Sequence, residues 1–344
     1  MRTDRPRSRR TLLAAGLALA VAVGGLRTAG LEAQQDLSAV EIEATHVSGP
    51  VYMLVGRGGN IAVSSGPDGA LMVDDQFAPL ADKIRAALQE IGQSADAAEL
   101  KFLLNTHWHG DHTGGNVEFG SEATIIAHSN VRRRLSTPQE RGENVTPAAP
   151  KDALPVITFE QSLNVHFNGE RISAIHIPSG HTDGDAVIYF MDSNVLHMGD
   201  DFFAGRFPFV DLASGGSVEG MLAGVQDVLD DVPDDVQIIP GHGPLSTKDD
   251  LRDYGRMLEE TIGLVREQMD GGASMEDIVA RGLGEAWADW GAGFISADQW
   301  LETIYRSLSG ANDGDYGPVN ADHEHDTAQK RGGHTHEKGG SGHP

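Results

Sequence analysis

Residues 105–116 read Asn-Thr-His-Trp-His-Gly-Asp-His-Thr-Gly-Gly-Asn, and this stretch is the most informative in the chain. It follows a short apolar run that is typical of a buried strand. In extended backbone the side chains of His107 and His109 point to the same face, so both imidazoles can bind one metal ion. Asp111 and His112 follow a glycine and can face a second ion. Nitrogen and oxygen ligands without sulfur suit zinc, and iron or manganese are also compatible.

Three further candidate ligands occur downstream, each beside a glycine or at the end of a predicted strand: His181, Asp200 and His242. A lone histidine is more often a structural residue than a metal ligand. His176 and His197 lie inside strand patterns, and we predict hydrogen-bonded core roles for them. Chance clustering is a poor explanation for three imidazoles and a carboxylate within six residues, so the first cluster predicts a metal site.

The elements around these motifs follow the order strands, helices, strands, helices. Short β-rich runs fill residues 40–75 and 156–198, and amphipathic helices are predicted at 80–91 and 217–232. Residues 136–154 are polar and contain prolines, which predicts a loop. Three C-terminal helices begin with capping signatures, namely Thr247…Asp250, Ser274…Asp277 and Ser296…Gln299. This order predicts an α/β (α+β) fold, with two β-rich halves face to face and helices outside.

The motifs His-x-His-x-Asp-His, Gly-His-Thr, Gly-Asp and Pro-Gly-His-Gly occur in this order, which resembles the metallo-β-lactamase-fold superfamily over about residues 51–242. The resemblance implies an αββα sandwich, here with extra C-terminal helices, and two zinc ions (Zn²⁺) per chain. The ligands that it assigns to the first zinc ion are His107, His109 and His181. Those that it assigns to the second are Asp111, His112 and His242, with Asp200 as the bridge between the ions.

The same resemblance assigns supporting roles around the ligands. Asp74 ends an early predicted strand and matches the superfamily's early aspartate, which supports the histidine-rich loop. Thr182 and Asp185 flank His181 and are candidates for supporting it, with a plain turn role as an equal alternative. The four phenylalanines that follow the bridging aspartate could wall a substrate pocket, but we expect at least two of them in the core: Phe202, Phe203, Phe207 and Phe209.

The residues after the bridging position bear on the substrate. One large lactamase subclass of the superfamily has cysteine at the position of Asp200, and a lysine soon after it binds the carboxylate of the drug. Here no lysine follows, and Arg206 is the nearest candidate substrate anchor. An aspartate bridge is commoner among esterases, thioesterases and lactonases. We therefore expect a hydrolase that uses a hydroxide shared by two zinc ions, oriented by Asp111, to cleave an acyl bond of a small molecule.

Two other functions remain open at this point. One is a mononuclear iron oxygenase of sulfur compounds on the same fold, although the complete second ligand set argues against it. The other is a periplasmic metal-binding protein, suggested by five histidines among acidic residues in the segment 311–344. That segment is poor in apolar residues, so we predict a disordered tail that collects zinc or has no function.

The N-terminal sequence and the overall composition indicate where the protein acts and which partners it can bind. Residues 1–33 combine a basic start, a short apolar run and small residues, which predicts a twin-arginine-like export signal ahead of a hydrolase domain at 36–310 and a periplasmic or secreted protein. No stable membrane insertion is expected after cleavage. A net charge of −25 disfavours nucleic acid as a partner. The absence of cysteine excludes disulfides and a thiol nucleophile. The oligomeric state stays open.

Overall fold

The computed structural model describes residues 37–310, apart from residues 93 and 142–143. The described residues fall into two units that are divided between residues 39 and 40. Of the first unit only a short 3₁₀-helix is described, η1 (Leu37–Ala39). The predicted export signal at 1–33 and the predicted tail at 311–344 therefore lie outside the described residues. Within the described part, no helix is both long and apolar enough to cross a membrane.

The second unit is built on two sheets, of which the first has seven strands in the order β1-β2-β3-β4-β5-β6-β9. Strands β1 to β4 pair antiparallel, whereas β4, β5, β6 and β9 pair parallel. The bounds of the seven strands are Glu43–Ser48 (β1), Val51–Val55 (β2), Ile61–Gly66 (β3), Gly69–Val73 (β4), Leu100–Leu104 (β5), Thr124–His128 (β6) and Ile157–Phe159 (β9).

The second sheet has six strands in the order β10-β11-β12-β13-β14-β15. All of its neighbours are antiparallel except β13 and β14, which run parallel. The bounds are Ser162–Phe167 (β10), Glu170–Ile177 (β11), Asp185–Phe190 (β12), Val195–His197 (β13), Gln237–Ile239 (β14) and Ser246–Thr247 (β15).

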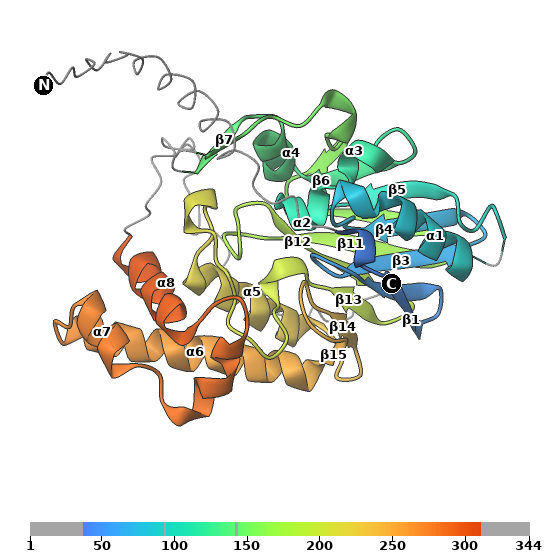
Figure 1. Ribbon diagram of the computed structural model, residues 1–344. Coiled ribbons are helices and arrows are strands. Elements are labelled where there is room, and N and C mark those ends of the chain that lie inside the picture. The colour runs from blue at the N-terminus through green and yellow to red at the C-terminus, as the bar shows by residue number, and fades with distance from the viewer. Residues whose placement is uncertain (1–36, 93, 142–143, 311–344) are drawn as a thin grey trace, which may run out of the picture. The chain divides into compact units, whose positions relative to one another are not determined.

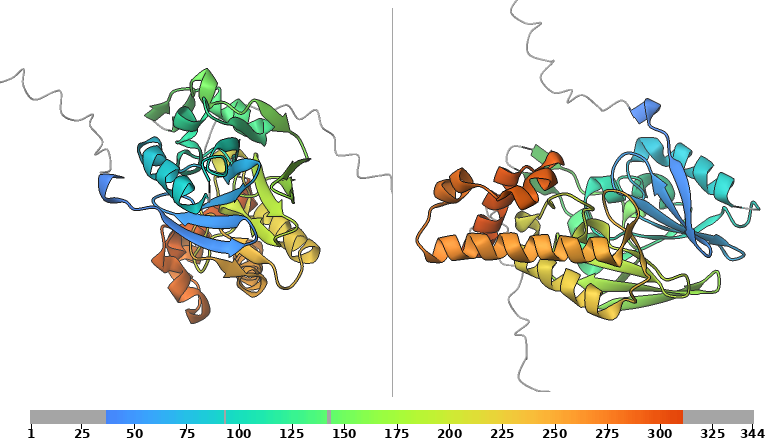
Figure 2. Two further views of the ribbon diagram at one scale, coloured as in Figure 1. Left: turned by 90° about the vertical axis from the view of Figure 1, so that its right-hand side faces the viewer. Right: turned by 90° about the horizontal axis from the view of Figure 1, so that it is seen from below.

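Helices cover the outer sides of the two sheets, so the layers are those of the expected αββα sandwich (Figures 1 and 2). Helices α1 and α4 contact the first sheet and α5 contacts the second. The α-helix bounds are Ala81–Ile91 (α1), Gly110–Thr113 (α2), Asn116–Phe119 (α3), Ser129–Leu135 (α4), Val218–Asp231 (α5), Lys248–Asp270 (α6), Met275–Arg281 (α7) and Ala297–Ser309 (α8).

Two apolar cores hold these layers together. One lies between the sheets and contains Leu71 and Ile126 from the first sheet and Ile188 and Ile239 from the second. The other packs the second sheet against α5, α6 and α8, with Trp300 fully buried. Burial of this apolar surface fixes the orientation of the strands and therefore the position of the loops at their ends.

All three C-terminal helices begin as predicted. Thr247, Ser274 and Ser296 are N-caps, and each forms a capping box with the residue three positions later. Each box satisfies backbone N–H groups that the first helical turn leaves without partners. The helix starts are therefore set locally by the sequence.

The segment 136–154 differs from the predicted loop. It contains the short hairpin of β7 (Gln139–Arg141) and β8 (Asn144–Thr146), followed by the 3₁₀-helix η3 (Lys151–Ala153). Strands of three residues are too short to produce a readable alternation. The end of α4 holds the segment instead, since the backbone N–H of Ala149 donates to the carbonyl oxygen of Leu135 at 2.8 Å and Gln139 Nε2 donates to that of Arg134 at 2.8 Å.

The sheet topology brings the motif loops together. Parallel neighbours end at the same edge of a sheet, so the segments that follow β4 and β5 lie side by side, as do those that follow β13 and β14. Asp74 follows β4, and the histidine-rich stretch follows β5. The bridging aspartate follows β13, and His242 follows β14.

Candidate metal centre

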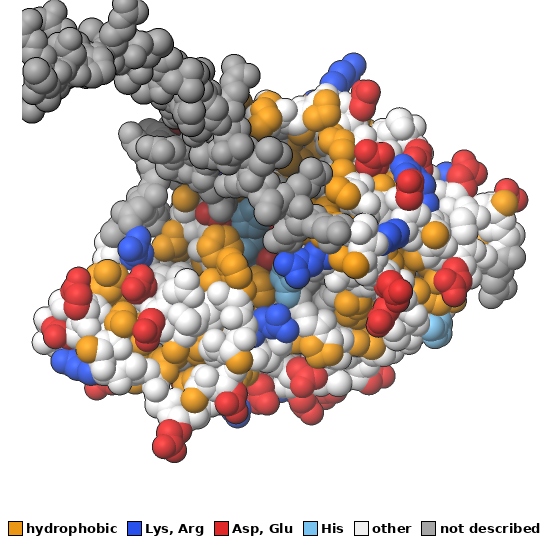
Figure 3. All heavy atoms as spheres, viewed as in Figure 1, with side chains coloured by type: hydrophobic (Ala, Val, Ile, Leu, Met, Phe, Trp, Pro, Cys, Tyr) orange, Lys and Arg blue, Asp and Glu red, His pale blue; other side chains and the backbone are white. Residues whose placement is uncertain are grey.

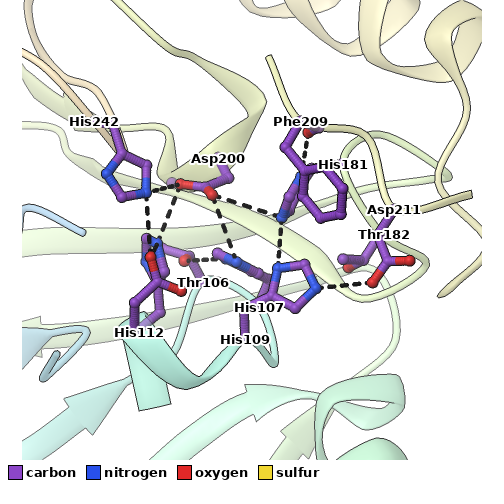
Figure 4. Close-up of polar contacts among 12 residues, drawn as sticks. Thr106, His107, His109, His112, His181, Thr182, Asp200, Phe209, Asp211 and His242 are labelled. Atoms are coloured by element: carbon purple, nitrogen blue, oxygen red, sulfur yellow. Dashed lines mark hydrogen bonds and ion pairs between the residues drawn. The ribbon is translucent and has the colours of Figure 1, made fainter. Parts of the chain in front are cut away.

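The seven predicted ligands lie in one cluster at these strand ends (Figure 4). Three overlapping groups have ligand atoms within 4.8 Å of one another: His107, His109 and His181; His107, His112 and Asp200; and Asp111, His112 and His242. The first and third groups are the two ligand sets that the sequence predicts. The structure therefore brings both sets together, although residues 107 and 242 are far apart in the chain.

Asp200 lies between the two groups, in the 3₁₀-helix η4 (Gly199–Asp201). Its Oδ1 is 3.1 Å from His112 Nε2 and 3.4 Å from His242 Nε2. Its Oδ2 is 3.6 Å from His181 Nε2 and 3.9 Å from His107 Nε2. One oxygen therefore faces each group, which is the geometry that a bridging carboxylate requires.

Hydrogen bonds fix the rings of the first group. His181 Nδ1 lies 2.7 Å from the carbonyl oxygen of Phe209, so it carries the proton and donates. His109 Nε2 lies 2.8 Å from Asp211 Oδ2, and its Nδ1 lies 2.8 Å from His181 Nε2. Each ring therefore turns one nitrogen to a fixed acceptor and the other into the cluster, where it is available as a ligand.

Asp74 holds the second group, as the resemblance implies. Its carboxylate accepts from the backbone N–H of Thr106 at 2.8 Å and from the Thr106 hydroxyl at 2.7 Å. Its Oδ2 is also 2.7 Å from His112 Nδ1. Asp74 is fully buried and has a φ of 63°, a conformation that aspartate tolerates better than most residues. The carboxylate thus ties the strand end to a ligand ring.

Sequence reasoning missed two residues that shape the site. Asp211 carries no motif, and only the fold brings it to His109, 102 positions away. Gly59, between β2 and β3, lies so close to His112 that a Cβ there would be 2.1 Å from the imidazole. The Gly-rich character of that loop was the one available signal, and it indicated a turn rather than a contact with the site.

Burial and charge divide the cluster into neutral and charged groups. Burial lowers the pKa of His181 to about 4, and burial and His112 lower the pKa of His107. Burial raises the pKa of Asp111, but His112 and His242 outweigh it and bring the value to about 2. Burial lowers the pKa of His242, but Asp200 and Asp111 outweigh it and bring the value to about 9. Neutral imidazoles and ionised carboxylates are the forms that bind metals.

The donor set fits metal ions for a second reason. Three buried atoms form no hydrogen bond of acceptable geometry with any described residue, namely His107 Nε2, His112 Nε2 and Asp200 Oδ1. Burying such atoms without partners costs about 1–3 kcal/mol each. All three face the interior of the cluster, so divalent cations there would satisfy them.

The remaining predicted residues lie around the cluster. Asp185 accepts from the backbone N–H of Thr182 at 2.7 Å and from its hydroxyl, and these bonds hold the turn that carries His181. Arg206 is half-buried, with its aliphatic stem against Gly293. The structure thus brings Thr182 and Asp185 to the site and leaves Arg206 outside the ligand cluster.

The phenylalanines divide as expected. Phe202 and Phe207 are buried in the core against Tyr254 and Trp300. Phe203 stacks on the ring of His242 with centroids 5.3 Å apart. The ring of Phe209 lies 5.8 Å from that of His181. On the face shown in Figure 3, histidine side chains lie in a hollow bordered by hydrophobic and by Lys or Arg side chains.

Comparison with known proteins places the chain in a family. The sequence profile of the metallo-beta-lactamase superfamily matches residues 44–262, more than half of the chain. The chain belongs to this superfamily. A hydroxyacylglutathione hydrolase from Synechococcus sp. (strain JA-3-3Ab) is 32% identical over 139 residues, which cover 40% of this chain and 45% of that protein. The matched regions cover between 45% and 68% of the length of the first three curated relatives.

Two solved structures share the fold. The sec-alkylsulfatase Pisa1 from Pseudomonas sp. has a TM-score of 0.60 and 16% identity, over 80% of this chain and 51% of that one. A metallo-beta-lactamase from Pontibacter korlensis has a TM-score of 0.51 and 18% identity, over 64% of this chain and 99% of that one. At these identities the likeness concerns the fold alone.

Proposed function

We propose that this protein is an exported hydrolase with two zinc ions per chain that cleaves an acyl bond of a small molecule. The bond is that of a lactam, lactone, ester or thioester. The observation that carries the proposal is the bridging position of Asp200, one oxygen of which faces each ligand group. The name of the Synechococcus relative, a hydroxyacylglutathione hydrolase, supports a metal-dependent hydrolase acting on an acyl compound.

Bound zinc would lower the pKa of water and polarise a carbonyl oxygen, which are the two requirements of acyl hydrolysis at neutral pH. The chain supplies the rest. Asp111 is 31% exposed and ionised, so it can orient the attacking oxygen and accept its proton. Phe203 and Phe209 flank the ligands and would exclude water from the apolar part of a substrate.

Metal analysis together with a substrate panel tests this proposal. Protein purified without chelator should contain about two zinc ions per chain, because seven ligand residues are too many for one tetrahedral ion. Zinc-loaded protein should cleave at least one member of a panel of lactams, lactones, thioesters and phosphoesters. The oxygenase alternative would be established if the protein always contained one metal ion per chain, if that ion were iron, and if the protein consumed oxygen when given a sulfur compound. Two zinc ions without any turnover would favour a metal-binding protein.

The variant Asp111→Ala tests the proposed role of that carboxylate. Turnover should fall by a factor of about 100 or more, because both a ligand and the proton acceptor are lost. Asp227→Ala, on the exposed face of α5, is the matched control and should keep wild-type turnover. Near-wild-type turnover of Asp111→Ala at full zinc loading would rule out this role.

Arg206 remains a candidate anchor for a substrate carboxylate. We propose that anchoring is weak, because Arg206 lies outside the ligand cluster and its stem packs on Gly293. Any lactamase activity should then have a high KM that rises further in Arg206→Ala. A low KM for a penicillin that is unchanged in this variant would contradict the proposal.

Export and the role of the C-terminal segment are also part of the proposal. Fractionation of cells that express the full chain should place the mature protein outside the cytoplasm. Replacement of Arg9 and Arg10 by lysine should retain it inside if the route is twin-arginine-dependent. A truncation after Gly310 should keep kcat with zinc in excess and should recover activity more slowly with zinc limiting.

A further inference from the structure

Helix α4 supplies three polar side chains that hold one residue of the turn carrying His181. That residue is Asp183, two positions after the ligand. Arg134 Nε and Nη2 donate to the two carboxylate oxygens of Asp183 at 2.7 and 2.8 Å, and Arg133 Nη2 donates to the same carboxylate at 3.0 Å. Asn130 Nδ2 donates to the carbonyl oxygen of Asp183 at 2.6 Å. The turn between β11 and β12 of the second sheet is therefore fixed to a helix that contacts the first sheet.

Arg134 differs from its neighbour Arg133 in burial and in a second contact. The side chain of Arg134 is 9% exposed, whereas that of Arg133 is 47% exposed. The guanidinium carbon of Arg134 lies 5.9 Å from the centre of the Trp108 ring, which is within the range of a cation–π contact. Trp108 stands between the ligands His107 and His109, and its ring lies 4.9 Å from that of His109. Arg134 thus contacts both loops that supply the first ligand group.

The first ligand group forms only if these two loops lie at the right separation. His107 and His109 follow β5 in the first sheet, whereas His181 lies between β11 and β12 in the second. A guanidinium is a rigid planar donor, so binding both oxygens of one carboxylate fixes an orientation as well as a distance. The cost of burying two charges offsets much of their attraction, so such a pair does more to fix geometry than to stabilise the fold.

We propose that Arg134 is a positioning residue for the first metal site, which holds the turn of His181 against Trp108 and so aligns the three ligands of that site. Ligands that are aligned in advance lose less conformational freedom when they bind a metal ion. The zinc affinity of the first group should therefore depend on Arg134, although this side chain is not itself a ligand. The inference rests on the proposed zinc centre.

The zinc affinity of the first group can be measured by itself in a background that lacks a ligand of the second group, His242→Ala. In this background Arg134→Met, which keeps an apolar stem, should lower the affinity about 10- to 100-fold in competition with a chelator. Arg133→Met is the matched control, because it removes the same charge from the same helix and the same partner. It should change the affinity less than about threefold, since its ion pair is half-exposed. Equal affinities of background, variant and control would overturn the proposal.

A purely structural role of Arg134 would change a different quantity. The metal-free protein would then melt at a lower temperature, while folded Arg134→Met would bind zinc as tightly as the background and give the same absorption spectrum with Co²⁺. In the positioning role the affinity falls and the cobalt spectrum changes, because that spectrum reports the ligand geometry. Arg134→Lys keeps the positive charge but not the planar pair of donors, so its affinity should fall between those of the background and Arg134→Met.

Asp183→Asn serves if Arg134→Met does not fold, because it weakens the same ion pair from the other side. It should also lower the zinc affinity of the first group. Adding Arg134→Met to Asp183→Asn should then cost less affinity than Arg134→Met costs alone, as expected for two residues that act through one contact. An unchanged affinity in folded Asp183→Asn would overturn the proposal.

Turnover distinguishes this inference from the proposed hydrolysis. If Arg134→Met weakens zinc binding but the zinc-loaded wild-type protein cleaves no member of the substrate panel, the positioning role stands and the proposed hydrolysis fails. If the wild-type protein cleaves a member of the panel but Arg134→Met and Arg133→Met bind zinc equally well, the hydrolysis stands and the positioning role fails. Wild-type protein that binds no zinc would overturn both.

Discussion

At the scale of single residues, carboxylates outside the ligand set control the orientation of the ligands. Asp74 holds His112 through its Nδ1, and Asp211 holds His109 through its Nε2. In both cases the carboxylate fixes the ring and leaves the other nitrogen facing the cluster. Such contacts raise the basicity of the imidazole and reduce the entropy lost on metal binding.

We expect Asp211 to be a positioning residue, whose removal should weaken the proposed first zinc site. We expect Asp211→Ala to lower the zinc affinity of that site about 10- to 100-fold, measured by competition with a chelator. In Asp211→Asn the amide oxygen can still accept from His109 Nε2 when it takes the place of Oδ2, so this variant should lose less. Asp298→Ala, at the exposed start of α8, is the control.

A purely structural role of Asp211 would give a different result. The melting temperature of the metal-free variant would then fall while the zinc affinity of the folded fraction stayed at the wild-type value. That combination would contradict the positioning role.

Protonation of His242 should make metal binding depend on pH. Its pKa in the metal-free protein is raised to about 9, because Asp200 and Asp111 outweigh the opposite effect of burial. Below that pH the ring is protonated, and a zinc ion must displace the proton. His112, in the same ligand group, also has a raised pKa, because Asp200, Asp111 and Asp74 outweigh the effect of burial. The metal affinity of this group should therefore rise at least about tenfold per pH unit from pH 6 to 8.5. Calorimetry in two buffers of different ionisation enthalpy would measure the protons released, and a pH-independent affinity would contradict this.

The sequence predicted which residues cluster much better than it predicted the residues that hold them in place. The seven clustered residues occupy motifs in a fixed order, and Asp74 matched a motif position as well. Asp211 and Gly59 were missed because no local pattern marks their contacts with the site. These contacts, with the rings of His109 and His112, arise only when the loop between β2 and β3 and the segment after β13 pack around the histidine-rich stretch.

At the scale of elements, the loop between β2 and β3 controls the second ligand group by close approach. The backbone N–H of Gly59 donates to the carbonyl oxygen of Asp111 at 3.1 Å, and its Cα faces the ring of His112. The side chain of Gln76 closes the loop by donating to the carbonyl oxygen of Gly59 at 2.7 Å. Any side chain at position 59 would therefore displace a ligand.

Gly59→Ala should impair the proposed second zinc site more than it impairs the fold. The added Cβ would be 2.1 Å from the imidazole, a separation that forces His112 to move. We expect zinc content to fall toward one per chain and turnover to fall by a factor of about 100 or more. Gly263→Ala on α6 meets no atom within 4 Å and should stabilise the protein by up to about 1 kcal/mol. If Gly59→Ala kept two zinc ions and normal turnover, the loop between β2 and β3 would have moved to accommodate the methyl group, and this prediction would be wrong.

Elements with local signals were predicted, and those that depend on packing were not. The sequence predicted the capping boxes of α6, α7 and α8 and most strands of the two sheets. Capping boxes and apolar runs can be recognised from a few neighbouring residues. The β7–β8 hairpin was predicted as part of a loop. Its short strands are held by Gln139 and by the end of α4, which the sequence around 136–154 does not reveal.

At the scale of the whole molecule, the excess of acidic residues opposes the approach of anions. The full chain carries a net charge of −25. Lys and Arg side chains border the hollow on the face of Figure 3, but acidic side chains are spread over the same face. Two zinc ions would bring four positive charges to a cluster that already contains the carboxylates of Asp111 and Asp200. The long-range field is therefore repulsive to anions, and the attraction is confined to the centre.

Ionic strength distinguishes the two contributions, because salt screens the long-range field over about 10 Å at 0.1 M and affects close contacts less. For an ester with an added carboxylate, kcat/KM should rise several-fold between about 0.01 and 0.2 M NaCl as the repulsion is screened. The control is 4-nitrophenyl acetate, which is neutral. Its kcat/KM should change less than about twofold over the same range of salt. A fall of kcat/KM with salt for the anionic ester alone would mean that cations at the mouth recruit the substrate. Arg206→Ala should then abolish the fall, and the substrate class would shift from neutral to anionic acyl compounds.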